Sequence, residues 1–165
     1  MSCDLSHLDD AGDPRMVDVG GKPMTRRVAT ASGLVRASSA LIDAIREDRV
    51  AKGSVLQVAR LAGIQAAKQT DSLIPLCHTL PIDAVHVELD LKEGGIAIRS
   101  EVSTTWKTGV EMEALTAVSV AALTVIDMGK AIDPAMTIER IQLDTKTGGK
   151  RGDWTRDEHR LDKPA

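Results

Sequence analysis

Residues 109–131 read GVEMEALTAVSVAALTVIDMGKA, and this stretch decides the fold of the chain. Two acidic residues, Glu111 and Glu113, come first, and an uncharged run over 114–126 follows them. Acidic side chains suit the positive end of a helix dipole, and alanine and leucine suit a helix interior. The stretch therefore predicts a long buried helix over 109–131.

Polar residues mark both ends of this predicted helix. Thr108 and Gly109 stand where an N-cap belongs. Asp127 lies in the last turn, where the negative end of the dipole disfavours a carboxylate, so fold stability alone does not select it. Lys130 follows three residues later and can offset the charge. Asp127 and Lys130 are therefore candidate functional residues.

Length and charge limit the function classes. The 165 residues suit one domain, 1–165, and the net charge of −3 argues against generic binding to nucleic acid or to anionic membranes. Trp106 and Trp154 are the only aromatic residues, so base-stacking platforms are nearly excluded. Two cysteines, Cys3 and Cys77, suggest no disulfide framework, and we expect a cytoplasmic protein without signal peptide or membrane span.

The rest of the chain alternates between strand and helix patterns. In chain order the predicted elements are a strand at 27–36, helices at 38–50 and 54–70, a rigid loop at 73–81, hairpin strands at 85–91 and 96–102, the helix at 109–131, and a strand at 136–143 with a bulge near Arg140. This order predicts an α+β, ferredoxin-like two-layer sandwich, an antiparallel sheet with helices packed on one face. Residues 1–25 are expected to form an extended arm, and 144–165 a Gly/Lys-rich loop with a flexible C-terminal tail.

Basic residues gather near glycines and near element ends. The run TKTGGKRG over 145–152 can bind phosphate through cations and unshielded amides, although a solvated basic tail is the more common meaning of such a composition. Further cations at predicted boundaries are Arg27, Lys52, Lys68, Lys107 and Lys130. Surface solubility is the ordinary explanation for lysine, but Lys52 abuts a glycine at a boundary, where its side chain can enter a cleft.

The loop LIPLCHTLP places His78 beside Cys77. Neighbouring side chains in extended backbone point in opposite directions, which argues against a thiol–imidazole dyad. His7, His86 and His159 do not complete a metal-ligand spacing, so no metal site is predicted. A hydrogen-bonded structural histidine and a substrate-binding one are both consistent with His78.

Helix length adds a geometric inference. Glu113 and Asp127 are fourteen positions apart, which is about 21 Å along a continuous helix. Both can serve one compact site only if two chains contribute. The second face of the sheet also has to be covered, which points to an oligomer.

Several motifs together carry a family resemblance. GVEMEALTAVSVAALTVIDMGKA, MVDV at 16–19, KGSVLQVARLAGIQAAK at 52–68, LIPLCHTLP and TKTGGKRGD at 145–153 resemble the cyclic pyranopterin monophosphate synthase family, the molybdenum cofactor biosynthesis protein C family, in collinear order over 16–153. The resemblance implies a lyase that takes the cyclised GTP intermediate made by a radical S-adenosylmethionine partner and forms a cyclic phosphate with loss of pyrophosphate. It implies no cofactor, and a homohexamer, a trimer of dimers, with sites at dimer interfaces.

The resemblance also assigns residues. The catalytic set it implies is Asp127, Lys130, Lys52 and His78. The substrate-binding set is Leu76, Cys77, His78, Met112, Glu113, Arg27, Lys68, Lys146 and Lys150. Within these sets Asp127 and Lys130 would transfer protons, with burial and mutual charge tuning their titration, while Glu113 would face the guanine-derived ring. Two departures from the family pattern stand out: Thr79 replaces a usual proline, and Gly129 replaces a residue that is often cysteine.

Two other function classes are weighed against this enzyme. A ferredoxin-like domain can bind a nucleotide as a regulatory module without catalysis, but such a sensor has little use for the Asp127–Lys130 pair. An RNA-binding domain is remote, because the chain is acidic and lacks Phe and Tyr.

Overall fold

The computed structural model describes residues 12–150 and 152–157. Its elements are β1 (Thr25–Arg36), α1 (Ser39–Arg46), α2 (Val55–Ala67), α3 (Thr70–Leu73), β2 (Ala84–Lys92), β3 (Gly95–Trp106), α4 (Glu111–Gly129), β4 (Thr137–Thr147) and β5 (Trp154–Thr155). Residues 12–24 contain turns and an isolated bridge at Pro14 but no helix or longer strand. The predicted residues Cys3, His7 and His159 lie outside the described part of the chain.

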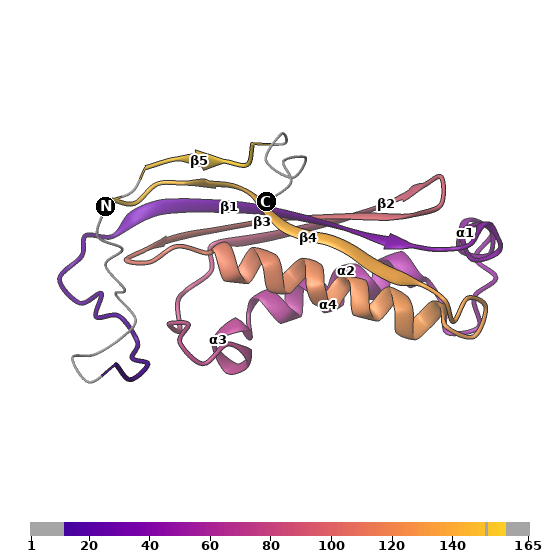
Figure 1. Cartoon of the computed structure of the whole chain (residues 1–165), viewed down its shortest axis with the longest axis horizontal. Coiled ribbons are helices and arrows are strands. Elements are labelled where there is room, and N and C mark those ends of the chain that lie inside the picture. Colours follow the sequence, from indigo (N-terminus) through magenta and orange to yellow (C-terminus); the bar gives the residue numbers. More distant parts are fainter. Residues whose placement is uncertain (1–11, 151, 158–165) are drawn as a thin grey trace.

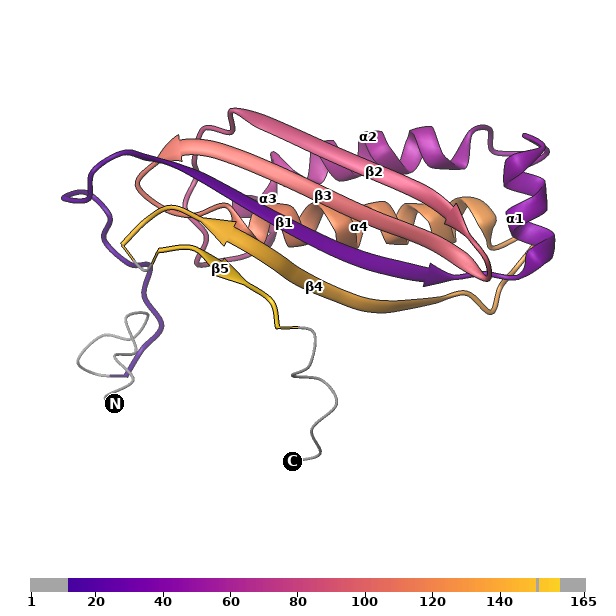
Figure 2. The same ribbon diagram turned by 90° about the horizontal axis from the view of Figure 1, so that it is seen from above.

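The sheet has the strand order β2-β3-β1-β4-β5, and neighbouring strands are antiparallel (Figure 2). The first four strands of this order, with helices between β1 and β2 and between β3 and β4, form the ferredoxin-like arrangement. The predicted α+β two-layer sandwich is therefore confirmed. β5 adds a short fifth strand that the sequence analysis missed.

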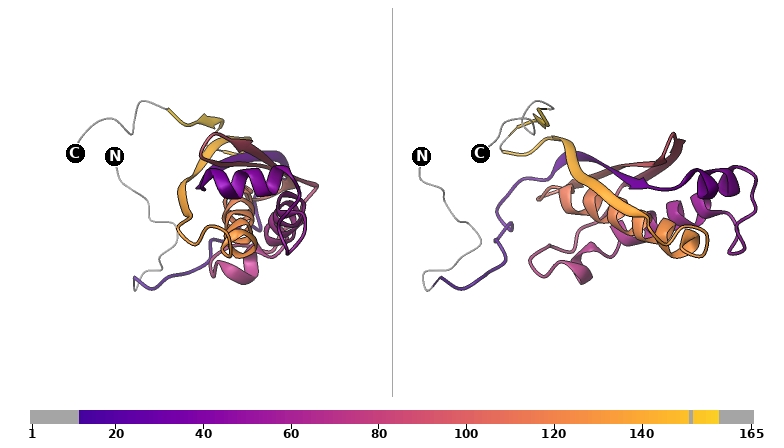
Figure 3. Two further views of the ribbon diagram at one scale, coloured as in Figure 1. Left: turned by 90° about the vertical axis from the view of Figure 1, so that its right-hand side faces the viewer. Right: turned by 45° about the vertical axis from the view of Figure 1, so that its right-hand side comes forward.

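The two long helices, α2 and α4, cover one face of the sheet (Figures 1 and 3). Many buried side chains of α4 are alanines, and because they are small the helix packs closely on both β1 and α2. Gly63 of α2 shows how tight this packing is, because a Cβ there would lie 2.9 Å from the carbonyl oxygen of Ala117. The core joins these alanines to buried aliphatic side chains of β1, β2, β3, α1 and α2, among them Val35, Leu89, Ile98, Leu41 and Val55.

By length and composition alone, α4 is apolar enough to cross a membrane, with a mean hydropathy of 1.5. However, 56% of that window is buried inside the protein. The core helix of a soluble protein has the same properties, so this single helix is weak evidence for a membrane span. Its apolar character is explained by the sheet and the helix that it contacts.

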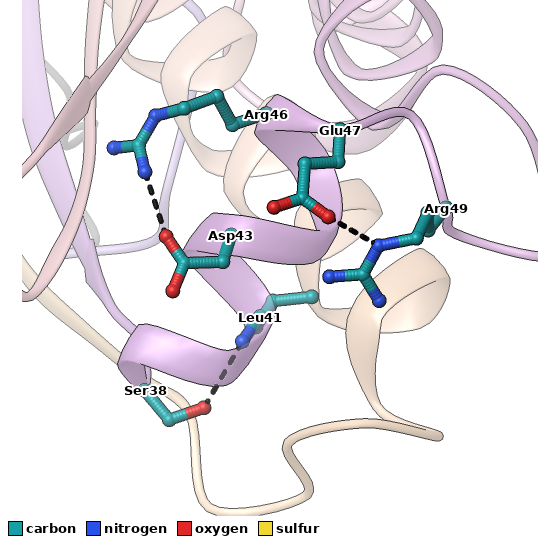
Figure 4. Close-up of polar contacts among 6 residues, drawn as sticks. All are labelled: Ser38, Leu41, Asp43, Arg46, Glu47 and Arg49. Atoms are coloured by element: carbon teal, nitrogen blue, oxygen red, sulfur yellow. Dashed lines mark hydrogen bonds and ion pairs between the residues drawn. The ribbon is translucent and has the colours of Figure 1, made fainter.

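Helix α1 lies at the end of the sheet where β1 finishes, and Figure 4 shows its polar contacts. The Ser38 hydroxyl accepts a hydrogen bond from the Leu41 amide at 3.4 Å, so the predicted start is confirmed. The predicted end near residue 50 is wrong, because the helix stops at Arg46. Asp48 has a φ of +56°, and this left-handed backbone does not continue a helix.

Boundaries of two other elements, α4 and β4, also differ from the sequence predictions. The N-cap position of α4 is Val110, not Thr108 or Gly109, and it makes no side-chain cap bond. The bulge near Arg140 is confirmed by a shift in register between β1 and β4. Strand β4 nevertheless continues to Thr147, so the segment expected to be loop from Asp144 begins as strand, because β1 still offers pairing partners there.

The sheet face opposite the helices is mostly polar, although the half-buried Leu34 also lies on it. Its outward side chains include Thr30, Ser32, Glu101 and Thr105, and Thr30 hydrogen-bonds Thr145 across the strands at 2.7 Å. Burial of apolar surface therefore does not require a covering layer on this face. The inference of an oligomer rests on the distance between the ends of α4 instead.

Candidate active site

Three of the predicted catalytic residues meet at the C-terminal end of α4. The Lys52 ammonium donates to Asp127 Oδ2 at 2.8 Å, and the Lys130 ammonium donates to Asp127 Oδ1 at 2.8 Å. Lys52 also donates to the main-chain oxygen of Asp127 at 2.8 Å, and so caps one of the last carbonyls of the helix. The loop between α1 and α2 thus brings Lys52 across 75 positions of sequence to one carboxylate.

The two lysines control the titration of this carboxylate. Hydrogen bonds from Lys130 and then Lys52, together with their positive charges, lower the pKa of Asp127 to about 2. Burial, which was also expected to tune this pKa, contributes least and in the opposite direction, since the Asp127 side chain is 58% exposed. Asp127 is therefore ionised at neutral pH and is a weak base.

Gly129 lies inside this helix end and has a packing reason to be glycine. A Cβ there would lie 2.7 Å from Leu41 Cδ2 and 3.2 Å from Met136 Cε, and Leu41 is fully buried. The departure from the family pattern thus makes room for α1 against α4. Lys130 keeps its bond to Asp127, so the glycine does not displace it.

The opposite end of α4 carries a buried carboxyl. Glu113 is 4% exposed in the first turn, and burial, aided by the negative charges of Glu111 and Asp71, raises its pKa to about 7. Burial also raises the pKa of the Cys77 thiol, with Glu113 and Asp71 contributing. Cys77 is thus disfavoured as a thiolate nucleophile, and its side chain is an uncharged thiol near Glu113.

The loop after α3 positions His78 and Thr79. His78 Nε2 donates to the carbonyl oxygen of Val17 at 2.6 Å, so the N-terminal segment contacts this loop at Val17. Thr79 donates to Asp71 Oδ2, a bond that the usual proline of the family could not make. Leu76 is half-buried in the same loop, and Met112 is 37% exposed at the start of α4.

Basic residues surround the same end of the helix. Lys146 Nζ lies 3.8 Å from Glu111 Oε1, and Arg27 donates to the carbonyls of Trp106 and Lys107. Lys150 is exposed in the turn after β4. Of the predicted substrate-binding cations, Lys68 stands apart, at the end of α2 in an open groove of about 440 Å³ with Ile64 and Val85.

Two positioning side chains were missed by the sequence analysis. Asp133 is 8% exposed and accepts hydrogen bonds from the amides of Ser38 at 2.6 Å and Ala135 at 3.1 Å, which joins the end of α4 to the start of α1. Asp71 holds Thr79 and faces Glu113. The Asp133-Pro134 turn signal could have revealed the first. No local pattern could have revealed the second.

The predicted site residues thus form two groups rather than one. α4 is continuous from Glu111 to Gly129, which leaves about 21 Å along the axis between Glu113 and Asp127. Within the described residues, no group of three or more His, Cys, Asp or Glu is arranged to hold a metal ion. The separation of the two groups in one chain agrees with the geometric inference from the sequence.

Comparisons with known proteins identify the family. The MoaC family model matches residues 16–149. A cyclic pyranopterin monophosphate synthase from a Nocardioides species is 57% identical, covering 92% of this chain and 95% of the relative. A relative with the same name from Novosphingobium aromaticivorans is 56% identical, covering 92% of this chain and 96% of the relative. Another, from Thermomicrobium roseum, is 55% identical, covering 94% of this chain and 95% of the relative.

Among solved structures, the designed protein Foldit4 aligns with 75% of this chain and 99% of its own at 10% identity and a TM-score of 0.31, which is too low to carry an argument. The family model spans most of the chain, and the three synthases match it at more than half of the aligned positions. The chain therefore belongs to the MoaC family.

Proposed function

We propose that this chain is a cyclic pyranopterin monophosphate synthase, a lyase of molybdenum cofactor biosynthesis. It converts (8S)-3′,8-cyclo-7,8-dihydroguanosine 5′-triphosphate to cyclic pyranopterin monophosphate and releases pyrophosphate. One observation carries the proposal: Lys52 and Lys130 share the carboxylate of Asp127 at 2.8 Å each, in a chain of this family. Three charged groups so close together can move protons and neutralise phosphate without a resident cofactor.

The reaction makes two demands on this cluster. Closing the cyclic phosphate joins a substrate hydroxyl oxygen to the α-phosphorus and breaks the bond from that phosphorus to the departing pyrophosphate. The hydroxyl proton must pass to a base, and negative charge grows on the leaving group. Because Asp127 is a weak base and an ammonium cannot accept a proton, we assign the hydroxyl proton to Lys130 acting as a neutral amine. The Lys52 ammonium neutralises the charge that grows on the departing pyrophosphate, and the Asp127 carboxylate holds both side chains in place.

The other end of α4 supplies recognition. Glu113, with its pKa near 7, can present both a donor and an acceptor to the guanine-derived ring, beside Leu76, Cys77 and Met112. Several cations suit a substrate with a triphosphate; in our proposal Lys146, Lys150, Arg27 and Lys68 serve it. His78 orients the substrate from the loop after α3.

Because these two ends lie about 21 Å apart, we infer that each site combines the Asp127 end of one chain with the Glu113 end of another. The proposed assembly is a homohexamer, a trimer of dimers, in the cytoplasm. A radical S-adenosylmethionine enzyme must supply the cyclised substrate. Light scattering checks the assembly, for which six chains of 17.6 kDa predict about 106 kDa.

The direct experiment supplies purified protein with the cyclised intermediate and follows pyrophosphate. We expect stoichiometric pyrophosphate and cyclic pyranopterin monophosphate, with GTP itself left intact as the matched control. Binding without pyrophosphate release would instead favour a nucleotide-binding regulatory module and would contradict the proposed activity.

A further inference from the structure

The Arg27 guanidinium makes two hydrogen bonds to backbone carbonyls. Its Nε donates to the carbonyl oxygen of Trp106 at 3.1 Å, and NH2 donates to that of Lys107 at 3.2 Å. The side chain is half-buried at the start of β1. A guanidinium held at two corners has a fixed plane, because both bonds must be kept together. Arg27 therefore ties β1 to the segment that leads from β3 into α4.

The turn between β4 and β5 rests on this plane. Gly149 has a φ of +80°, and a Cβ at this position would overlap Arg27 NH1 and lie 3.1 Å from Cζ. A Cβ on Gly148, which has a φ of +82°, would likewise overlap the main-chain oxygen of Arg26. The turn is closed by a bond from the Gly152 amide to the Gly149 carbonyl at 3.1 Å. The glycines thus allow the turn to lie directly over the start of β1.

Lys146 stands immediately before this turn. It pairs with Ala29 of β1 on one side and with Trp154 of β5 on the other, and its ammonium faces Glu111. Because Lys146 lies only two residues before Gly148, a shift of the turn would shift the end of β4 and, with it, the Lys146 ammonium. The contact between Gly149 and Arg27 limits that shift.

We propose that Gly149 packs against the Arg27 guanidinium and that this contact, the interlock, holds Lys146 and the β4–β5 turn where they can bind the triphosphate of the substrate. Arg27 is then a positioning residue, because its Nε and NH2 groups are hydrogen-bonded to backbone carbonyls. This deepens and rests on the proposed function. It changes the role of Arg27, since a freely mobile guanidinium would tolerate a methyl group at Gly149.

The chain offers a matched control for the substitution Gly149→Ala. Gly152 lies in the same turn with a φ of +68°, yet a Cβ there would meet nothing within 4 Å. Both substitutions place alanine in left-handed backbone, so both carry the same kind of conformational strain. Only Gly149→Ala also pushes against Arg27. Any excess effect at Gly149 therefore reports the interlock.

Pyrophosphate release from the cyclised intermediate is measured for both variants. We expect Gly149→Ala to raise KM by about tenfold over Gly152→Ala, with kcat within about twofold, because the turn positions a binding group and not the cluster at Asp127. Gly149→Ala should also lose more melting temperature than Gly152→Ala, because the overlap with Arg27 adds to the backbone strain that both variants share. Equal KM values for the two variants would overturn the interlock.

A double-mutant cycle tests whether the effect passes through Arg27. Lysine at this position keeps the charge but lacks the guanidinium plane, so Arg27→Lys should relieve the overlap. We expect Gly149→Ala with Arg27→Lys to show a KM no higher than that of Gly149→Ala alone. Losses that simply multiply would refute the coupling.

The cycle also separates this inference from the proposed activity. The melting temperatures of the same four proteins report coupling between the two positions without any substrate. Wild-type protein that releases no pyrophosphate would defeat the proposed function, while coupled melting temperatures would still support the contact. Active wild type with uncoupled KM values and melting temperatures would defeat the interlock alone.

Discussion

The two ends of α4 treat the same functional group in opposite ways. At the C-terminal end the exposed Asp127 has a pKa of about 2, whereas at the N-terminal end the buried Glu113 has a pKa of about 7. The helix dipole alone favours the reverse order, because it stabilises anions at the N-terminus and destabilises them at the C-terminus. Two lysines at one end and desolvation at the other therefore outweigh the dipole.

The contrast indicates that the two ends of the 109–131 motif have different tasks, although they belong to one continuous helix. An ionised carboxylate between two ammonium groups suits proton and phosphate chemistry, whereas a carboxyl that is close to half-protonated at neutral pH suits recognition of a ring with mixed donors and acceptors. Each end can be disturbed alone.

The largest effect is expected at the Asp127 end. Lys52→Ala and Asp127→Ala should each lower pyrophosphate turnover by at least about a hundredfold, the scale of a lost acid–base or positioning group. Folding should survive, because both side chains are about half exposed. Steady-state turnover and thermal melts check both points.

Asp90→Ala is the matched control, since Asp90 is an exposed carboxylate paired with Lys92 at 3.6 Å on the hairpin. It should leave turnover unchanged. If Lys52→Ala or Asp127→Ala keeps more than about a tenth of wild-type turnover with an unchanged melt, the role given to that residue is wrong.

The second prediction joins the two ends. Glu113→Ala protein mixed with Lys130→Ala protein should regain activity, because some dimers then hold both defects in one site and leave the other intact. Random reassortment makes about half of the dimers mixed, each with one good site, so recovery should approach roughly a quarter of wild type.

Native mass spectrometry of the same mixture provides the control for subunit exchange. Mixed oligomers without recovered activity would show that one chain supplies both residues to a site. The composite site would then be abandoned, whereas the separate roles of the two ends would stand.

The third prediction concerns the buried carboxyl. Glu113 binds its proton more tightly in the folded protein than in the unfolded chain, so folding stability falls as pH rises from about 4.5 through 7. Glu113→Gln should remove this slope, which amounts to at most about 3 kcal/mol at 1.36 kcal/mol per pKa unit. Urea unfolding at pH 5 and pH 8, at fixed protein concentration, measures it.

Glu101→Gln, on the exposed sheet face, serves as control and should leave the slope in place. A wild-type slope that persists in Glu113→Gln would assign the titration to another group. It would also remove half of the contrast between the two ends.

The smallest expected effect is at Gly129. Alanine gains roughly 0.5–1 kcal/mol of helix propensity but crowds the buried Leu41, and overpacking typically costs 1–3 kcal/mol. We expect a net loss of about 1 kcal/mol with turnover within twofold of wild type. Chemical denaturation measures the change in the free energy of unfolding. A variant more stable than wild type would show that the Leu41 side chain can move aside at little cost.

Hydrophobic patterns with a clear period predicted most of the elements of the fold. Alternation in the hairpin and the apolar run of α4 located their elements, because one buried face selects each residue. The end of α1 was misplaced because apolar Val50 extends the pattern beyond the left-handed Asp48. β5 was missed because two residues carry no period, and pairing with β4 alone defines the strand.

The candidate site was predictable in identity but not in geometry. Motif matches named Asp127, Lys130 and Lys52, yet no sequence rule says that Lys52 reaches across from the loop after α1 to touch the same carboxylate. Nor does spacing reveal that Asp71 lies near Glu113. Contacts between distant segments depend on how the layers pack, and local patterns do not record that.

The hydrogen bond between His78 and Val17 fixes the tautomer of the histidine. A carbonyl oxygen only accepts, so Nε2 must carry the proton, and in the neutral ring Nδ1 is left with a lone pair. Toward a substrate, neutral His78 can therefore take a proton or accept a hydrogen bond through Nδ1, but it can donate from that nitrogen only as imidazolium. The N-terminal segment, by supplying one carbonyl, thus determines the direction in which the ring can exchange protons.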